Sequence, residues 1–141
     1  MQFDPNSNII KLCAQGMDLE GKGEPEKAYK LFMQAWDESA NDFEKIISAH
    51  YVARHQKNVK DKLIWDEMAL QLALKMDEES MKTNYPSLYL NIAKCYEDLL
   101  DFPNARLNYQ SALFFANALP DDGYGNMIRS GIQKGMERVT G

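Results

Sequence analysis

The two histidines, His50 and His55, are the side chains whose type is best suited to metal binding or proton transfer. They are five residues apart in a segment with a helical pattern, and at ~100° per residue their side chains point about 140° apart. Imidazoles in this relation are poorly placed to bind one zinc ion together. The spacing predicts a packed or surface role for both histidines and no metal site.

The two cysteines, Cys13 and Cys95, are candidates for nucleophilic chemistry. They lack CxxC spacing and lie among helix-forming residues, and neither has a histidine beside it in the sequence. A nucleophilic thiol needs a nearby base or positive charge to lower its pKa. Pairing with His55 in space is left open, but the local sequence predicts reduced thiols that pack in the interior.

One glycine-containing segment, Asp121-Asp122-Gly123-Tyr124-Gly125-Asn126, has some features of a phosphate-binding or adenosylmethionine-binding loop. Such loops follow a buried β-strand. Here the residues before it are the helical segment 114–119 and Pro120, so we expect a turn that caps a final helix. Acidic runs such as 77–79 are typical of solvated helix faces. The sequence therefore predicts no catalytic residue, no cofactor and no enzyme.

The charge and hydrophobicity of the chain indicate which classes of protein it can belong to. The 141 residues are 45% hydrophobic, which predicts a single domain, 1–141, with a continuous core. With 21 acidic and 16 basic side chains and a net charge of −5, binding to nucleic acid through a basic surface is not expected. Residues 1–8 do not look like a secretory leader, and the uncharged stretch 107–120 is too short to cross a membrane. We expect a cytoplasmic protein without membrane contact.

The whole sequence has the pattern of an all-helical protein, so we expect every candidate residue above to lie on or beside a helix. Glycines and prolines fall at the edges of segments with apolar residues at three- and four-residue intervals, which is where helices begin and end. Seven helices and no strand follow. They are expected to form three antiparallel hairpins at about 8–40, 42–83 and 84–118 and a last helix at about 122–139. The second helices carry the aromatic residues Trp36, Trp65, Phe114 and Phe115, and most of these side chains are expected in the core.

A pattern of small and large residues occurs in the first hairpin and again in the third. The first hairpin has a large-small-large triplet followed by a small-aromatic-small triplet, and the third repeats both at the same spacings. A small residue on each helix allows its neighbour to approach, and the aromatic ring fills the remaining gap. The matched positions are Leu12, Gly16, Leu19, Ala28, Phe32 and Ala35 in the first hairpin and Tyr89, Ala93, Tyr96, Ala105, Tyr109 and Ala112 in the third.

These residues resemble the tetratricopeptide repeat, whose period is about 34 residues. Ala35 and Ala69 have this separation, although the middle hairpin is degenerate. One register matches Gly16 with His50 and Phe32 with Asp66, and a register shifted by one residue is left open. The resemblance implies a TPR-like α-solenoid of three hairpins with a C-terminal capping helix. About nine residues added at 71–84 would extend the fourth helix by roughly 14 Å if helical.

In such repeats the first helices of successive hairpins line a concave groove, so the resemblance also implies a binding surface. The residues it places there are Ile10, Cys13 and Met17, then Ile47, Tyr51, Arg54 and His55, then Asn91, Lys94, Glu97 and Asp98. Arg54, with Tyr51 and His55, could hold a carboxylate, a phosphate or a peptide backbone. The leading hypothesis is an adaptor that binds a peptide or protein segment.

Two further hypotheses stay open. The same groove could enclose a small anionic ligand in a sensor or an enzyme accessory protein, with Tyr51, Arg54 and Lys94 as contacts. Apolar residues near the ends, such as Phe3, Ile9 or Met136, could also bury themselves in a homodimer.

Overall fold

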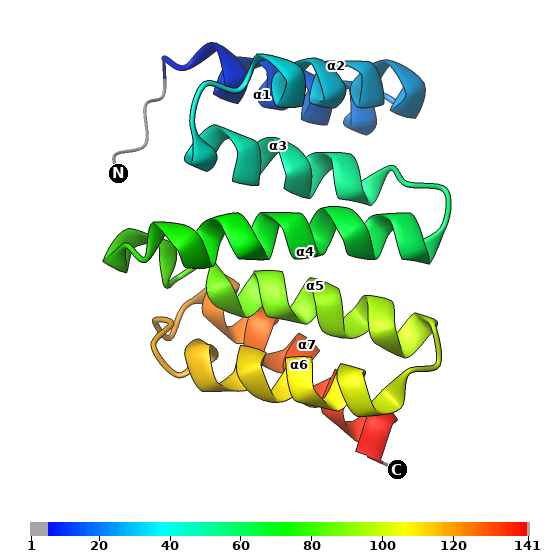
Figure 1. Ribbon diagram of the computed structural model, residues 1–141, viewed down its shortest axis with the longest axis vertical. Coiled ribbons are helices and arrows are strands. Elements are labelled where there is room, and N and C mark those ends of the chain that lie inside the picture. Colours follow the sequence, from blue (N-terminus) through cyan, green and yellow to red (C-terminus); the bar gives the residue numbers. More distant parts are fainter. Residues whose placement is uncertain (1–5, 141) are drawn as a thin grey trace. The chain divides into compact units, whose positions relative to one another are not determined.

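The computed structural model describes residues 6–140, and every regular element in this range is helical. Seven α-helices and one short 3-10 helix follow one another along these residues (Figure 1). In chain order they are α1 (Asn8–Gly21), α2 (Pro25–Glu38), α3 (Asp42–Arg54), α4 (Val59–Met76), η1 (Glu79–Met81), α5 (Tyr85–Asp98), α6 (Phe102–Ala116) and α7 (Gly123–Thr140). The prediction of an all-α fold is confirmed.

The N–H groups in the first turn of a helix have no partner within the helix. The helices here begin where a side chain accepts a hydrogen bond from such a group, or where a proline removes the group. The Ser7 hydroxyl accepts a hydrogen bond from the N–H two residues later at 3.2 Å, and the Asn41 side chain accepts one from the N–H of Glu44 at 2.9 Å. Pro25 and Pro103 lie in the first turns of α2 and α6, where a missing N–H costs no helical hydrogen bond. These short-range signals explain why the starts of the helices can be read from the sequence.

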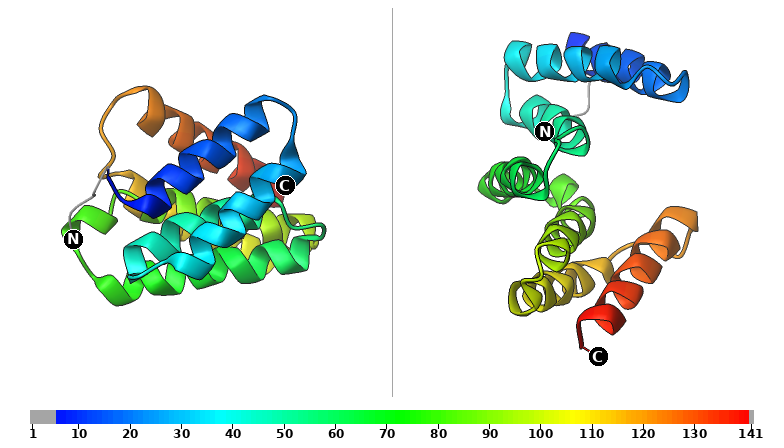
Figure 2. Two further views of the ribbon diagram at one scale, coloured as in Figure 1. Left: turned by 90° about the horizontal axis from the view of Figure 1, so that it is seen from above. Right: turned by 90° about the vertical axis from the view of Figure 1, so that its right-hand side faces the viewer.

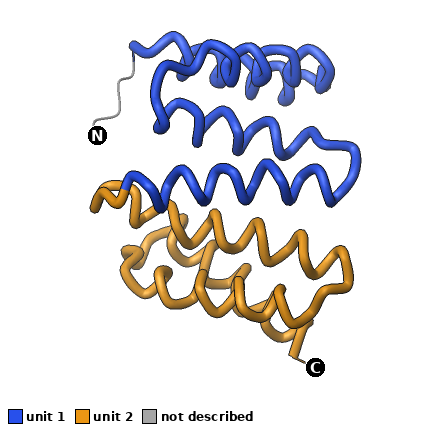
Figure 3. Tube along the Cα trace, in the orientation of Figure 1, with its two compact units in different colours: residues 1–76 blue, residues 77–141 orange. Residues whose placement is uncertain are grey.

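The chain divides into two compact units, residues 1–76 and 77–141 (Figure 3). The described part of the first contains α1 to α4, and that of the second contains η1 and α5 to α7. Each unit has buried apolar clusters of its own. The prediction of a single domain stays a prediction.

The first unit consists of two helical hairpins, α1 with α2 and α3 with α4, and α2 also packs against α3 (Figure 1). Phe32 of α2 is fully buried at its centre and lies against Gly16 of α1. The fully buried Ala28, Ala35 and Val52 line the same cluster. Burying a phenylalanine side chain contributes about 1.5–3 kcal/mol to the stability of the fold. The small residues beside Phe32 are needed for this burial, because larger side chains would leave no room for the ring.

Two contacts between α1 and α3 join residues that are 34 positions apart, Met17 with Tyr51 and Glu20 with Arg54. The same separation of 34 residues relates Phe32 to Asp66, as in the first of the two registers considered for the middle hairpin. Asp66 of α4 is only 3% exposed and accepts a hydrogen bond from Lys62 Nζ at 2.7 Å. A buried carboxylate therefore occupies the place that an aromatic ring fills in the first hairpin.

The residues added at 71–84 do not form one long helix. α2 ends at Glu38, and the residue 34 positions later is Leu72. α4 ends at Met76, four residues beyond Leu72, which amounts to about 6 Å of extra helix. Asp77 then takes a φ of 46°, a left-handed conformation that Asp tolerates and that ends a helix. The 3-10 helix η1 and its buried Met81 follow before α5. The condition for an extension of roughly 14 Å, that all of the added residues continue the helix, is therefore not met, because α4 ends at Met76.

The second unit consists of the α5/α6 hairpin and α7, which packs on both of its helices (Figure 2). The fully buried Tyr109 of α6 lies against Gly135 of α7. Arg129 of α7 donates hydrogen bonds to the carbonyls of Ala116 and Leu119, both at 3.1 Å. Since the last carbonyls of a helix lack partners within it, Arg129 both caps α6 and holds α7 in place.

Of the aromatic residues Trp36, Trp65, Phe114 and Phe115, three are half-buried in ring contacts and one is exposed. Trp36 and Trp65 pack edge to face with ring centroids 5.0 Å apart, and Phe115 stacks on Tyr89 at 5.7 Å. Phe114 is 72% exposed and is the member of this group that lies outside the core. Consecutive residues of a helix point about 100° apart, and only Phe115 is turned towards α5.

Candidate functional site

The predicted binding residues of the first unit lie together on one surface of α1 and α3. We call this surface the α1/α3 face and define it by Met17 of α1 with Ile47, Tyr51 and Arg54 of α3. Met17 is 47% exposed, and Ile47 and Tyr51 are half-buried against the core. Cys13, which the resemblance placed in the groove, is buried in the interior, as expected of a packing thiol.

Tyr51 is held on three sides. Its hydroxyl donates a hydrogen bond to Met17 Sδ at 3.1 Å, its ring stacks on Phe32 with centroids 4.9 Å apart, and the guanidinium of Arg54 lies 4.8 Å above the ring centroid. Partial burial raises the pKa of Tyr51 above its ordinary value, although the charge of Arg54 acts in the opposite direction. Tyr51 thus stays a neutral phenol with a fixed ring.

Glu20, at the C-terminal end of α1, contacts two of the basic residues that the sequence assigned to the groove, Arg54 and His55. One carboxylate oxygen accepts a hydrogen bond from Arg54, and the other lies 2.6 Å from His55 Nε2. Glu20 is absent from the predicted set of site residues. The signal that could have found it is its separation from Arg54, which equals the repeat period of 34 residues.

The pairing changes the chemistry that Arg54 can offer. The Arg54 side chain is 40% exposed, but its positive charge is balanced by Glu20. His55 is more enclosed, with its ring 5.4 Å from that of Phe32 and 6.1 Å from that of Tyr29. The cluster of Glu20, Arg54 and His55 therefore acts as a link between α1 and α3 and leaves little net attraction for an anion.

Two further predicted residues, Asn91 and Lys94, belong to α5 in the second unit. Lys94 Nζ lies 2.7 Å from an oxygen of Asp98 and 3.7 Å from one of Glu97, so its charge is also balanced by nearby carboxylates. Asn91 is half-buried on the same helix. That Asn91 and Lys94 face Tyr51 and Arg54 across a shared groove stays a prediction.

Glu97 is the centre of a second polar cluster, which joins all three helices of the second unit. It accepts a hydrogen bond from the Tyr109 hydroxyl of α6 at 2.7 Å and one from Arg138 Nε of α7 at 2.8 Å. The hydrogen bond from Arg138 is the main reason that the pKa of Glu97 is lowered. Burial and the hydrogen bond to Glu97 raise the pKa of Tyr109. This cluster fixes α7 on the hairpin.

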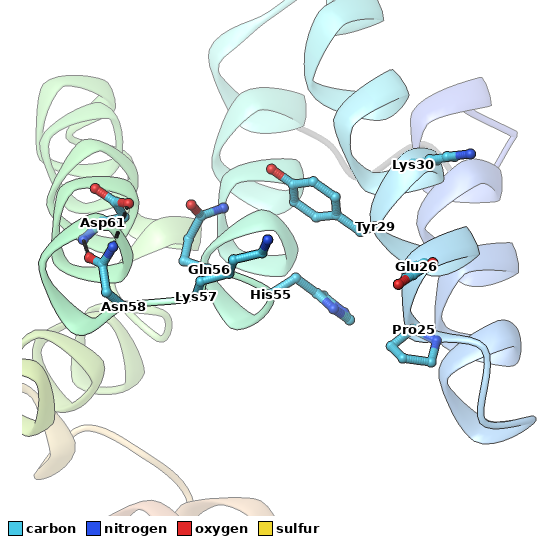
Figure 4. Close-up of a pocket in the computed structure, with 9 residues that line it drawn as sticks. All are labelled: Pro25, Glu26, Tyr29, Lys30, His55, Gln56, Lys57, Asn58 and Asp61. Atoms are coloured by element: carbon cyan, nitrogen blue, oxygen red, sulfur yellow. Dashed lines mark hydrogen bonds between the residues drawn. The ribbon is translucent and has the colours of Figure 1, made fainter.

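A cavity of about 640 Å³ opens where the start of α2, the end of α3 and the start of α4 meet (Figure 4). Tyr29 and His55 line its middle, with Glu26 and Lys57 nearby, whereas Lys30 extends away from the other labelled side chains. His55 thus connects the cavity with the charge cluster at Glu20. Because the lining carries charges of both signs, the cavity does not select a ligand of one charge.

Three other candidates from the sequence have structural roles in the described residues. The segment 121–126 forms the turn into α7, with Asp122 Oδ1 accepting a hydrogen bond from the Gly125 N–H at 2.8 Å, as expected of a cap. His50 is half-buried, and the partial loss of solvent lowers its pKa. Cys13 and Cys95 are both buried thiols. Within residues 6–140, no three His, Cys, Asp or Glu side chains are grouped closely enough to hold a metal ion.

Among the described helices, none is both long enough and apolar enough to cross a membrane.

No protein-family model matches the sequence, and no curated protein matches it. Among solved structures, the crystal structure of PcrH from Pseudomonas aeruginosa superposes with a TM-score of 0.67, covering 99% of this chain and 97% of PcrH. The fold is TPR-like. The sequences are 21% identical, so the similarity concerns the fold alone.

The TPR-like fold agrees with the small and aromatic residues from which it was inferred. Gly16 beside Phe32 and Ala93 with Tyr109 are the packing positions that the repeat pattern predicts, and all four are buried. The similarity to PcrH extends over almost the whole chain, including α7. The architecture therefore rests on both the residue pattern and the superposition.

Proposed function

We propose that the protein is a protein-binding helical-repeat module whose α1/α3 face holds a peptide segment of a partner. The exposed surface formed by Met17 beside the fixed ring of Tyr51 carries this proposal. Stacked helical hairpins bury a continuous core and leave extended surfaces of first helices, which repeat proteins use for binding. The TPR-like fold supports such a surface here.

The chemistry of the α1/α3 face suits an apolar side chain of the partner. Met17 is flexible and polarisable, which lets it adapt to ligands of different shape. Tyr51 presents an aromatic ring whose position is set by Phe32 and Arg54, so little conformational entropy is lost when a ligand covers it. Aromatic residues in such positions often carry much of the binding energy of an interface.

The alternative of a small anionic ligand has less support from the side-chain pairing. Glu20 balances Arg54, and Asp98 and Glu97 lie beside Lys94. An anion would have to compete with these carboxylates for the same donors, and each is already close to its partner. The observed pairing favours a peptide that contacts Met17 and Tyr51 over an anion that contacts Arg54 and Lys94.

The proposal can be tested with a photo-crosslinking amino acid at position 17. A benzoyl-phenylalanine introduced there should capture a partner, whereas the same residue at Ile64, which is 58% exposed on α4 of the same unit, should not capture it. The captured protein is identified by mass spectrometry and then purified. This design separates binding at the α1/α3 face from adhesion to any exposed apolar residue.

The affinity of the purified partner then decides the role of each side chain. Tyr51→Ala should weaken binding by about tenfold or more, which corresponds to about 1.4 kcal/mol, and Met17→Ala should weaken it as well. Ile64→Ala is the matched control and should leave the affinity unchanged. Circular dichroism checks that each variant remains folded. Equal affinities for the wild type and the Tyr51→Ala and Met17→Ala variants would show that the partner binds elsewhere.

A further inference from the structure

Two of the three apolar residues that the sequence suggested for self-association are covered within their own unit. Ile9 is buried in the core of the first unit, and Met136 packs against the clusters of the second. Phe3 lies outside the described residues. Ile9 and Met136 therefore do not provide the exposed apolar ends that a homodimer would need, and self-association stays a prediction.

The cavity at the start of α2 has the size of a small-molecule site and shares no residue with the α1/α3 face. Its volume of about 640 Å³ falls within the range of about 300–1,000 Å³ that is usual for ligand pockets. One wall is the start of α2, and the other consists of the turn after α3 and the start of α4 (Figure 4). All of the lining residues belong to the first unit, so the cavity is a feature of one compact body.

Several polar groups of the lining already bind other groups of the protein. Asn58 and Asp61 form two hydrogen bonds with each other at the start of α4, at 2.9 and 3.0 Å. Gln56 donates a hydrogen bond to a carbonyl of α3 at 3.1 Å, and His55 Nε2 lies 2.6 Å from a carboxylate oxygen of Glu20. These groups fix the shape of the walls and are not available to bind the charges of a ligand.

Two charged groups on different walls have no such partner. Glu26 of α2 and Lys57 of the α3–α4 turn form no ion pair or hydrogen bond with a residue that the structure describes. Glu26 has Lys30 four positions later, the spacing at which opposite charges pair on a helix, yet Lys30 extends away from the other lining side chains (Figure 4). Asp61, the other acidic residue of the lining, is held by Asn58. A carboxylate on one wall and an ammonium group on the other are thus free to bind a ligand.

The rings of Tyr29 and His55 provide apolar surface between these charges. Their centroids are 6.1 Å apart with an interplanar angle of 42°, and both side chains are half-buried. Tyr29 also packs against the apolar cluster around Phe32, which restricts the motion of its ring. Aromatic rings in this relation can receive another ring in a stacked or edge-to-face contact. The cavity therefore combines two opposite charges at its walls with an aromatic surface in its middle.

We propose that this cavity binds a small zwitterion with an apolar side chain, of which a free aromatic amino acid is the simplest example. The ammonium group of the ligand pairs with Glu26, its carboxylate pairs with Lys57, and its ring packs against Tyr29. A ligand with a single charge satisfies only one of the two charged groups. The site differs from the groove considered for a small anion, because its contacts come from α2 and the α3–α4 turn.

Nuclear magnetic resonance titrations of the full chain with three related compounds test the proposal. L-Phenylalanine carries both charges, phenethylamine carries only the ammonium group, and 3-phenylpropionate carries only the carboxylate. Because the charged groups are exposed to solvent, L-phenylalanine should bind with a dissociation constant on the order of a millimolar. Each of the other two compounds should bind about three- to tenfold more weakly. The amide signals of Tyr29 and of residues 55–58 should shift, whereas those of the second unit should not.

Substitutions at the two charged groups should change the preference among these compounds in opposite ways. Glu26→Gln should weaken the binding of L-phenylalanine to the level of 3-phenylpropionate, whose own affinity should not fall. Lys57→Gln should weaken it to the level of phenethylamine. Glu24→Gln is the matched control, because Glu24 also lies at the start of α2 but pairs with Lys27 and does not line the cavity. Glu26 and Lys57 are exposed, so both variants should fold, as circular dichroism can verify.

Three results would overturn the proposal. The first is the absence of shifts at the cavity when L-phenylalanine is added up to its limit of solubility. The second is an equal affinity for the three compounds, which would show that the opposite charges do not act together. The third is an equal loss of affinity in Glu24→Gln and Glu26→Gln, which would show an effect of the general charge of α2 and no direct contact with Glu26.

Discussion

The ring of Phe32 lies so close to the backbone of Gly16 that a Cβ added at residue 16 would be 2.7 Å from Cζ and 2.9 Å from Cδ1. Real Cβ atoms do not approach ring carbons this closely, so either the ring or the helix would have to move. Phe32 is fully buried, and its ring also supports the stacked ring of Tyr51. The contact between Gly16 and Phe32 thus connects the core with the α1/α3 face.

Gly16→Ala should lower the free energy of unfolding of the first unit by about 1–3 kcal/mol, because overpacking in a filled core costs this much. Gly21→Ala in the same helix is the control, since nothing lies within 4 Å of a Cβ at that position. It should be neutral or slightly stabilising. Urea denaturation followed by tryptophan fluorescence measures both, as Trp36 and Trp65 lie in the first unit. Equal stabilities would mean that Phe32 relaxes freely.

The fold could be inferred from the sequence because the determining interactions repeat at fixed spacing. Gly16 with Phe32 and Ala93 with Tyr109 recur in two hairpins, and prolines and caps set the helix starts. The end of α4 could not be inferred, because Asp77 has no special sequence signal and only its φ of 46° shows the break. Local patterns specify helices, whereas the position of an irregular turn depends on tertiary packing.

The candidate site was only partly inferable for a related reason. The repeat pattern placed Met17, Ile47, Tyr51 and Arg54 on one face, and the structure brings these four together. It did not reveal that Glu20 pairs with Arg54 and His55. Side-chain pairing between helices depends on rotamers, and a sequence pattern gives only the direction in which a residue points.

Trp36 of α2 and Trp65 of α4 should be energetically coupled. Their rings meet edge to face with centroids 5.0 Å apart and an interplanar angle of 84°. In a double-mutant cycle of Trp36→Leu and Trp65→Leu, the coupling energy should be about 0.5–1.5 kcal/mol, as for other aromatic pairs. Urea denaturation followed by circular dichroism measures the four stabilities. A coupling energy near zero would show that the two rings contribute only by separate burial.

The two cysteines should react slowly while the protein is folded. Burial raises the pKa of Cys13 to about 11, so at pH 8 only about one thiol in a thousand is ionised, and the thiolate is the reactive form. Cys95 is buried as well. Alkylation by iodoacetamide, followed by mass spectrometry, should be much slower in the native chain than in denaturant. Rapid alkylation of the native Cys13 would indicate that α1 opens readily.

Glu97 should make the attachment of α7 depend on pH. Its bond with Arg138 lowers its pKa in the folded protein, so the interaction is fully present above the unfolded pKa of about 4.3 and is lost as the pH falls through the folded pKa. Hydrogen exchange of α7 amides should therefore report weaker protection below about pH 4.3, after correction for the intrinsic exchange rate. Glu97→Gln should reduce protection at neutral pH and show a smaller further loss on acidification.

Asp98→Asn is the matched control for this prediction, because Asp98 lies next to Glu97 on α5 but pairs with Lys94 and not with α7. It should keep the acid-dependent loss of protection in α7. If Asp98→Asn and Glu97→Gln behaved alike, the effect would come from the general charge of α5. If Glu97→Gln kept the full pH dependence, another acidic group would control the docking of α7, and the bond from Glu97 to Arg138 would contribute little to it.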